Sequence, residues 1–226
     1  GIDPSGNNLN IGCSLNGIYE SNEGHNLYHN SIFIGGSPTG GNSNSYALNS
    51  VVGTNSRIYK NNIFYNSRSN NGSTGTHFSL KYGGTTFNPT GLSSNSNVIL
   101  SDGVGSKLGY FNAVAYSDIG AWQTAVGEDF NSLSYDPHFI EPDGNSLSVN
   151  LHIDSATPSI IETNGAEITS VTVDFDGESR NSLTPHDVGA DAGNFIRIIP
   201  YTPVSVSGAL DNNGNFATLS AAFAAI

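Results

Sequence analysis

NLYHNSIFI, at residues 26–34, returns as RIYKNNIFY at residues 57–65. The match aligns Ile32 with Ile63, 31 residues further on, and a weaker third copy places Val98 another 35 residues along the chain. A repeat of about this length is typical of solenoids, in which each unit is one supersecondary motif stacked on the next. We therefore expect Ile32, Ile63 and Val98 to form one ladder of stacked side chains.

A second short segment recurs between these copies. It reads GIYE at residues 17–20, YALN at 46–49 and FSLK at 78–81, with spacings of 29 and 32 residues. We expect Tyr19, Leu48 and Leu80 to stack as a second ladder. Because no 3.6-residue apolar stripe occurs before residue 110, each unit holds short strands and no helix. The pattern predicts an all-β fold, a right-handed parallel β-helix.

Asparagines mark the bend before a strand in the aligned copies, at Asn30 and Asn61. A stacked Asn can satisfy the backbone of its own turn and bond to its neighbour in the next coil. We interpret Asn30 and Asn61 as such a ladder; the alternative is that Asn is simply common in turns. Two inserts rich in Gly, Ser and Asn, at residues 37–45 and 67–76, are expected on one face, often the binding face of a solenoid.

The charge is low and unevenly placed. The net charge is −12, charged residues make up 12% of the chain, and the pI is about 4.5. Residues 1–100 carry three acids and four bases, and the other 16 acids lie after residue 100 with three bases. Without a basic stripe, nucleic acid is excluded as a partner. No apolar run reaches about 18 residues, so no membrane insertion is expected.

The pattern changes after residue 112. Residues 117–127 predict a short helix with Ser117 as its N-cap and Gly127 as its end. Trp122 lies on the apolar stripe of this helix, which favours a core position over a sugar-stacking one. We divide the chain into β-helix coils at 1–112, a helix and closing strap at 113–197, and a linker with the start of a following module at 198–226, including a helix over 216–226.

Five motifs then follow in a recognisable order: DPHF at 136–139, LHI at 151–153, TPSI at 157–160, DFDG at 174–177 followed by an arginine, and DVGA at 187–190. Over about residues 30–195 the chain resembles the closing part of secreted right-handed parallel β-helix surface proteins of the Bacteroidetes type. Such proteins are large and multi-domain, and many use type IX secretion. The resemblance implies an internal fragment of an extracellular or cell-surface protein. It is specific for architecture and says little about function.

The acidic turn of this region has two interpretations. Asp174, Asp176 and Glu178 alternate like the start of a Ca²⁺ loop, but position 185 is a proline where the twelfth-position glutamate of such a loop would stand. The structural interpretation is a clasp in which Arg180 pairs with Asp174, Asp176 or Asp187. We favour the clasp over Ca²⁺ and expect no other cofactor and no firm metal site.

The function that these patterns favour is a non-enzymatic structural or adhesive module. Its expected partners are neighbouring domains of the same long chain, with surface glycans or other cell-surface proteins as further candidates. The alternative is a polysaccharide-binding or polysaccharide-cleaving β-helix, for which Tyr28, Tyr59 and Tyr65 are candidate stacking residues. Cleavage needs clustered acids, or a base with Ca²⁺. After Asp3, residues 1–100 offer only Glu20 and Glu23, in one unit, so we assign no catalytic residue.

Overall fold

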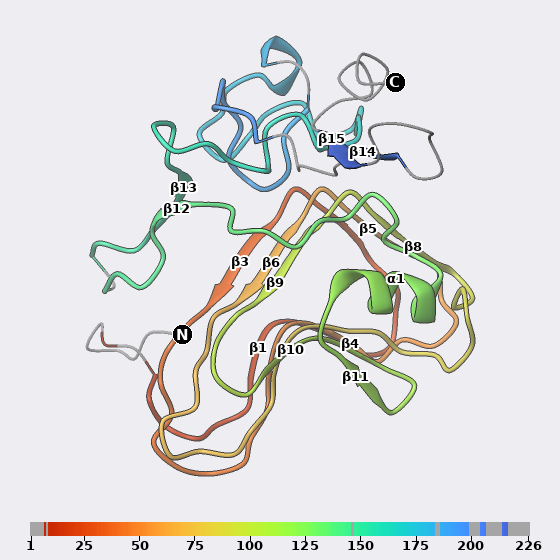
Figure 1. Ribbon diagram of the computed structural model, residues 1–226, viewed down its shortest axis with the longest axis vertical. Coiled ribbons are helices and arrows are strands. Elements are labelled where there is room, and N and C mark those ends of the chain that lie inside the picture. The colour runs from red at the N-terminus through yellow and green to blue at the C-terminus, as the bar shows by residue number, and fades with distance from the viewer. Residues whose placement is uncertain are drawn as a thin grey trace.

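The computed structural model of the chain describes residues 7, 9–145, 147–183, 186–198, 204–206 and 214–216. It is a parallel β-solenoid of about three turns, as predicted. In Figure 1 three sheets form the sides of a roughly triangular coil, and the C-terminal region lies beyond one corner. Among the described residues, no helix has the length and apolar character needed to cross a bilayer.

Each turn of the solenoid contributes one strand to each sheet, and all pairs between successive turns are parallel. The first sheet contains β1 (Leu15–Glu20), β4 (Ser45–Ser50), β7 (His77–Lys81), β10 (Ser106–Phe111) and β11 (Val114–Tyr116). The second contains β2 (Asn26–Tyr28), β5 (Arg57–Lys60) and β8 (Leu92–Asn95). The third contains β3 (Ser31–Ile34), β6 (Ile63–Asn66) and β9 (Val98–Ser101).

The predicted pairing of Ile32 with Ile63 is wrong by one residue. Ile32 lies opposite Phe64, and Ser31 lies opposite Ile63, which continues to Val98 as predicted. Because side chains alternate along a strand, this shift sends Ile32 and Ile63 to opposite faces of the third sheet. Ile32 packs against the core inside the coil, whereas Ile63 belongs to a second core outside it. Both faces are apolar, so sequence similarity alone could slip by one position unnoticed.

The second ladder is partly right. Leu48 and Leu80 are opposite each other and fully buried, as expected. Their neighbour in β1 is Ile18, however, and Tyr19 is 59% exposed on the outer face. The first turn therefore contributes an isoleucine to this ladder, where we expected the adjacent tyrosine.

The asparagine ladder exists, but Asn61 is not part of it. Nδ2 of Asn30 donates to Oδ1 of Asn62 (2.8 Å), and Nδ2 of Asn62 donates to Oδ1 of Asn97 (3.0 Å). Asn61 instead occupies the corner position just before the ladder, with φ of +58°, as do His29 and Ser96 in the other turns. Asn tolerates this left-handed conformation better than most residues, so two consecutive asparagines have different roles.

The C-terminal end of the stack is closed by α1 (Ile119–Val126), the predicted helix. Its N-cap is Asp118, whose side chain accepts from the Ala121 N–H, and not the predicted Ser117; Gly127 ends it with φ of +80°. Trp122 is fully buried in the inner core, as expected. A Cβ on Gly109 of β10 would lie 2.3 Å from the Trp122 ring, so a glycine is required for this close approach.

The closing region after α1 covers the outer face of the third sheet. It includes β12 (Phe139–Glu141), β13 (Asn150–Ile153) and a 3₁₀ turn, Arg180–Ser182. Its apolar side chains pack with Ile63 and Val98 in the second core, beside β3 and β6 in Figure 1. Further along, β14 (Val204–Val206) and β15 (Gly214–Phe216) pair antiparallel. The helix predicted over 216–226 lies outside the described residues, except that Phe216 ends β15.

Candidate functional site

The three tyrosines predicted to stack on glycans lie in different environments. Tyr59 is fully buried, and its hydroxyl donates to Glu20 and to Ser50, so it is a core residue and no sugar platform. Tyr28 is half-buried on β2. Tyr65 is 8% exposed and donates to Asp102 (2.8 Å). Burial, and then the hydrogen bond to Asp102, raise the pKa of Tyr65 above its ordinary value, so it stays a neutral donor.

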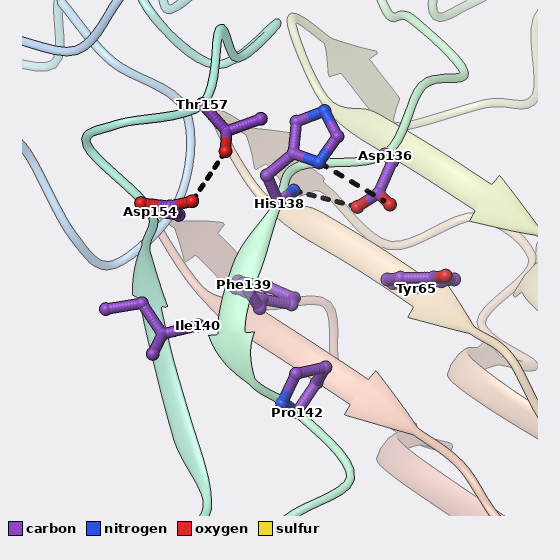
Figure 2. A pocket seen from close by; sticks show the side chains of 8 residues that line it. All are labelled: Tyr65, Asp136, His138, Phe139, Ile140, Pro142, Asp154 and Thr157. Atoms are coloured by element: carbon purple, nitrogen blue, oxygen red, sulfur yellow. Dashed lines mark hydrogen bonds and ion pairs between the residues drawn. The ribbon is translucent and has the colours of Figure 1, made fainter.

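Tyr65 nevertheless borders a pocket of about 460 Å³ between β6 and the closing region (Figure 2). The backbone of His138 has φ of +61°, and its N–H donates to Oδ1 of Asp136 (2.8 Å). Asp154 accepts from the Thr157 hydroxyl (2.5 Å), which lowers the pKa of its carboxyl and keeps it ionised. The pocket is lined by Tyr65, Asp136, His138, Phe139, Ile140, Pro142, Asp154 and Thr157. It combines two acids with apolar walls.

The predicted clasp forms differently from the expectation. Arg180 is 4% exposed, and its guanidinium donates to the carbonyls of Val173, Gly189 and Ala190. No salt bridge joins it to a carboxylate within the described residues. Arg180 thus holds two backbone segments of the closing region together, but through carbonyls, because the nearby acids bind backbone N–H groups instead.

Two of those acids show this directly. Oδ1 of Asp174 accepts the N–H groups of Asp176 (3.0 Å) and Glu178 (2.8 Å), so this carboxylate shapes its own turn. Asp187 is 2% exposed and accepts the N–H groups of Thr163 and Gly193. Burial raises the pKa of Asp187 to about 7, despite these hydrogen bonds. The alternative of Ca²⁺ binding at the acidic turn is not tested by these contacts.

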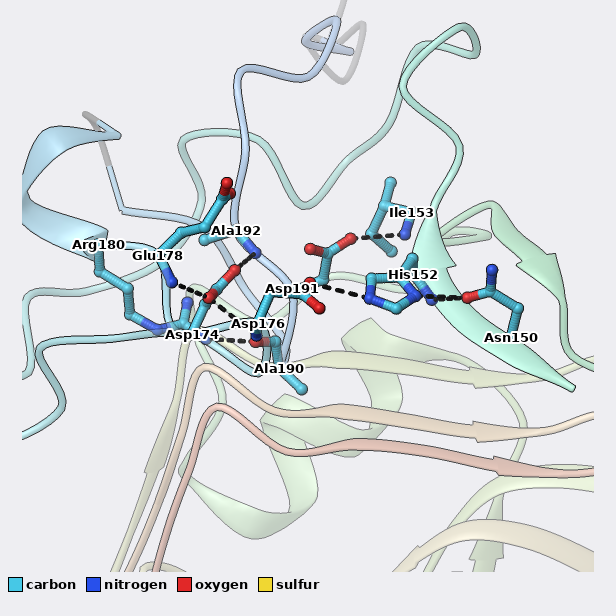
Figure 3. Close-up of polar contacts among 10 residues, drawn as sticks. All are labelled: Asn150, His152, Ile153, Asp174, Asp176, Glu178, Arg180, Ala190, Asp191 and Ala192. Carbon is cyan, nitrogen blue, oxygen red and sulfur yellow. Dashed lines mark hydrogen bonds and ion pairs between the residues drawn. The ribbon is translucent and has the colours of Figure 1, made fainter.

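Three side chains that the sequence analysis did not group together, among them Asp176 of this turn, lie close to one another (Figure 3). His152 comes from β13, Asp176 from the acidic turn and Asp191 from the segment that follows Arg180. One nitrogen or oxygen atom of each lies within 4.8 Å of the others. Asp191 is 9% exposed, and burial raises the pKa of its carboxyl above the ordinary value. Neither spacing nor motif links positions 152, 176 and 191, so only the fold identifies them.

Aromatic rings also line up on the outer face of the first sheet. Tyr46 and Phe78 stack with centroids 5.3 Å apart, Phe78 meets Tyr110 edge-on at 5.5 Å, and Nζ of Lys81 lies 5.7 Å from the Tyr46 centroid. Phe78 is buried but belongs to neither core cluster, because its neighbours in this row cover it. The repeat of 32 residues between Tyr46 and Phe78 is the signal that could have revealed this row.

Comparisons with protein-family models, curated proteins and solved structures found no match to this chain. What is established is the class: a parallel β-solenoid.

Proposed function

We propose that this chain is a non-enzymatic structural or adhesive module of a secreted, cell-surface protein. The observation that supports the non-enzymatic role most directly is that buried carboxylates within the coils are occupied by hydrogen bonds between successive turns. Glu20 accepts from Ser50, Tyr59 and His25, all on the first two turns. A carboxylate surrounded in this way fixes successive turns relative to each other and is not free to act on a substrate.

Asp129 has the same role at the other end of the stack. It is fully buried and accepts from Trp122 Nε1 (3.0 Å), Ser94 (2.7 Å), Ser132 (2.8 Å) and Nδ2 of Asn97 (3.2 Å). The asparagine ladder therefore ends on a carboxylate that also anchors the capping helix. Internal ladders that begin and end within the chain suit a rigid spacer.

The two inserts predicted on one face give this spacer a regular surface. The N–H of Asn71 donates to the Pro38 carbonyl (2.9 Å), and that of Thr74 donates to the Gly41 carbonyl (2.9 Å), so the inserts are layered like the coils. Surface loops are the usual place for binding residues on a rigid scaffold. Composition and the resemblance to Bacteroidetes-type surface proteins support an extracellular location.

The non-enzymatic part is tested by incubating the protein with a panel of acidic and neutral polysaccharides. We expect no new reducing ends and no unsaturated products above a control without protein. Product release that co-purifies with the protein and disappears in Asp154→Asn would overturn the proposal, because it would place chemistry in the pocket of Figure 2.

Glycan binding without cleavage is the second candidate, favoured by that same pocket. Asp136 and Asp154 can accept hydrogen bonds from sugar hydroxyls, while Ile140 and Pro142 offer apolar contact. A glycan array would show binding that falls at least about tenfold in Asp154→Asn, the loss expected for a charged hydrogen bond. Glu23→Gln, which removes an exposed acid on the coils, is the matched control. Equal binding by both variants would exclude the pocket as the site.

A further inference from the structure

The hydrogen bonds of Asn150 determine which nitrogen of His152 carries a proton. The backbone N–H of His152 donates to Oδ1 of Asn150 (2.9 Å), which identifies that atom as the amide oxygen. Nδ1 of His152 lies 2.5 Å from the same oxygen (Figure 3). Because an amide oxygen only accepts, Nδ1 must be the protonated nitrogen.

This leaves the other ring nitrogen facing acids. In a neutral imidazole protonated at Nδ1, Nε2 carries a lone pair, and it lies 2.9 Å from Oδ2 of Asp176. A carboxylate oxygen of Asp191 completes the group within 4.8 Å. Three electron-pair donors from three separate segments thus converge, and they repel one another unless a cation lies between them. That cation is a proton, carried by His152 or by a carboxyl group, or a metal ion.

The surroundings favour a metal ion. A metal-binding histidine usually donates its other N–H to a carbonyl or carboxylate, as Nδ1 of His152 does to Asn150. Asp191 is similarly held, since its Oδ2 accepts the Ile153 N–H (2.8 Å). The side chains of His152 and Asp176 are 37% and 46% exposed, so an ion can enter from solvent and complete its coordination with water.

We propose that His152, Asp176 and Asp191 form a binding site for one divalent transition-metal ion of the Zn²⁺ type. One imidazole and two carboxylates suit Zn²⁺ or Mn²⁺, whereas Ca²⁺ takes sites made of oxygen ligands. The ion would join β13, the acidic turn and the segment after Arg180, which are three parts of the closing region. The site shares Asp176 with the Ca²⁺ loop considered as the alternative to the clasp, but not Asp174, whose Oδ1 accepts backbone N–H groups.

The test is calorimetric titration of tag-free, metal-free protein with Zn²⁺, followed by thermal unfolding with and without the ion. We expect one Zn²⁺ per chain and a higher unfolding midpoint when it is bound. Asp176→Asn and His152→Gln should each weaken binding at least about tenfold, and Asn150→Ala about 10–100-fold, as for other residues that orient a ligand. Asp176→Asn changes a half-exposed side chain, so it is informative even if His152→Gln fails to fold.

His138 and Asp136 provide a matched control. They form another histidine–aspartate pair in the closing region, with 3.7 Å between Nδ1 and Oδ2, but no third ligand is grouped with them among the described residues. Asp136→Asn should bind Zn²⁺ like the unmodified protein. Failure to bind Zn²⁺ at millimolar concentration, unchanged binding in Asp176→Asn, or displacement of Zn²⁺ by an equal concentration of Ca²⁺ would overturn the proposal. Nitrogen NMR that shows His152 doubly protonated at neutral pH and unaffected by Zn²⁺ would assign the site to a proton instead.

Discussion

Replacing Asn97 by alanine should destabilise the solenoid strongly, because this side chain is the last asparagine of the ladder and joins Asn62 to Asp129. Its Oδ1 accepts the backbone N–H of Asn62 (2.9 Å), and its Nδ2 donates to the Tyr59 carbonyl (3.0 Å). All three residues are at most 1% exposed, so water cannot replace these bonds. Asn97→Ala therefore removes the partner of two buried backbone groups, at about 1–3 kcal/mol each.

The expected loss is thus about 4 kcal/mol, within a range of about 2–6 kcal/mol. Urea unfolding followed by fluorescence of Trp122, the sole tryptophan, measures it as a lower midpoint at unchanged slope. The matched control is Asn55→Ala, in an exposed turn where Nδ2 donates to the Asn22 carbonyl (2.8 Å). That variant should lose less than about 0.5 kcal/mol. If both substitutions cost the same, the ladder does not hold the coils together.

Three further predictions concern the stability of the protein in acid, the Arg180 clasp, and the contact between Gly109 and Trp122 of the helix that closes the stack. Burial, and then the charge of Arg68, lower the pKa of His77 from 6.5 to about 4. Neutral His77 therefore stabilises the folded state fully above pH 6.5, and this contribution, up to about 3 kcal/mol, is lost as the pH falls to about 4. Buried Asp187, with a pKa of about 7, has the opposite effect, because its contribution to stability is lost as the pH rises from 3.8 to 7. The measurement is therefore the difference in urea stability between the unmodified protein and His77→Gln across this pH range. A difference that does not change with pH would contradict the lowered pKa of His77. Arg180→Met should cost about 1–3 kcal/mol, because the buried Gly189 carbonyl loses its donor while the Ala190 carbonyl keeps the Phe175 N–H. It should also speed proteolysis of the closing region, and cleavage no faster than in Arg197→Met, an exposed arginine, would disprove the clasp. Gly109→Ala should lower thermal stability by about 1–3 kcal/mol and change Trp122 fluorescence, since the added methyl meets the indole ring, whereas Gly53→Ala, where a Cβ meets no atom, should not.

The fold could be predicted from the sequence because the repeat survives in the residues that build it. Apolar positions recur every 30 or so residues, and the helix that closes the stack has its own cap and stripe. The register could not be fixed, because the third sheet is apolar on both faces: Ile32 serves the inner core and Ile63 the outer one. In the predicted register Ile63 pairs with Ile32, whereas in the structure it pairs with Ser31, so alignment by residue similarity favours the wrong register.

The candidate sites were less predictable for a different reason. Arg180 and Asp174 both lie in the closing region, but their hydrogen-bond partners are backbone groups, which carry no sequence signature. His152, Asp176 and Asp191 come together only because three segments converge outside the third sheet. Tyr59 was proposed as an exposed aromatic, but it pairs with Leu27 and its side chain lies in the inner core.

The pairing of strands β2 and β5 allows the most direct measurement of how the coils stack. Tyr28 lies opposite Lys60, and both are half-buried, so cysteines at these two positions share a face. Neighbouring strands are about 4.8 Å apart, a separation that a disulfide can span. Two variants are compared in a Cys13→Ser background, one with cysteines at positions 28 and 60 and one with cysteines at positions 28 and 59. After mild oxidation, mass spectrometry should detect a disulfide in the first variant and none in the second. A bond at 28 and 59, or none at 28 and 60, would contradict the in-register stacking of the coils.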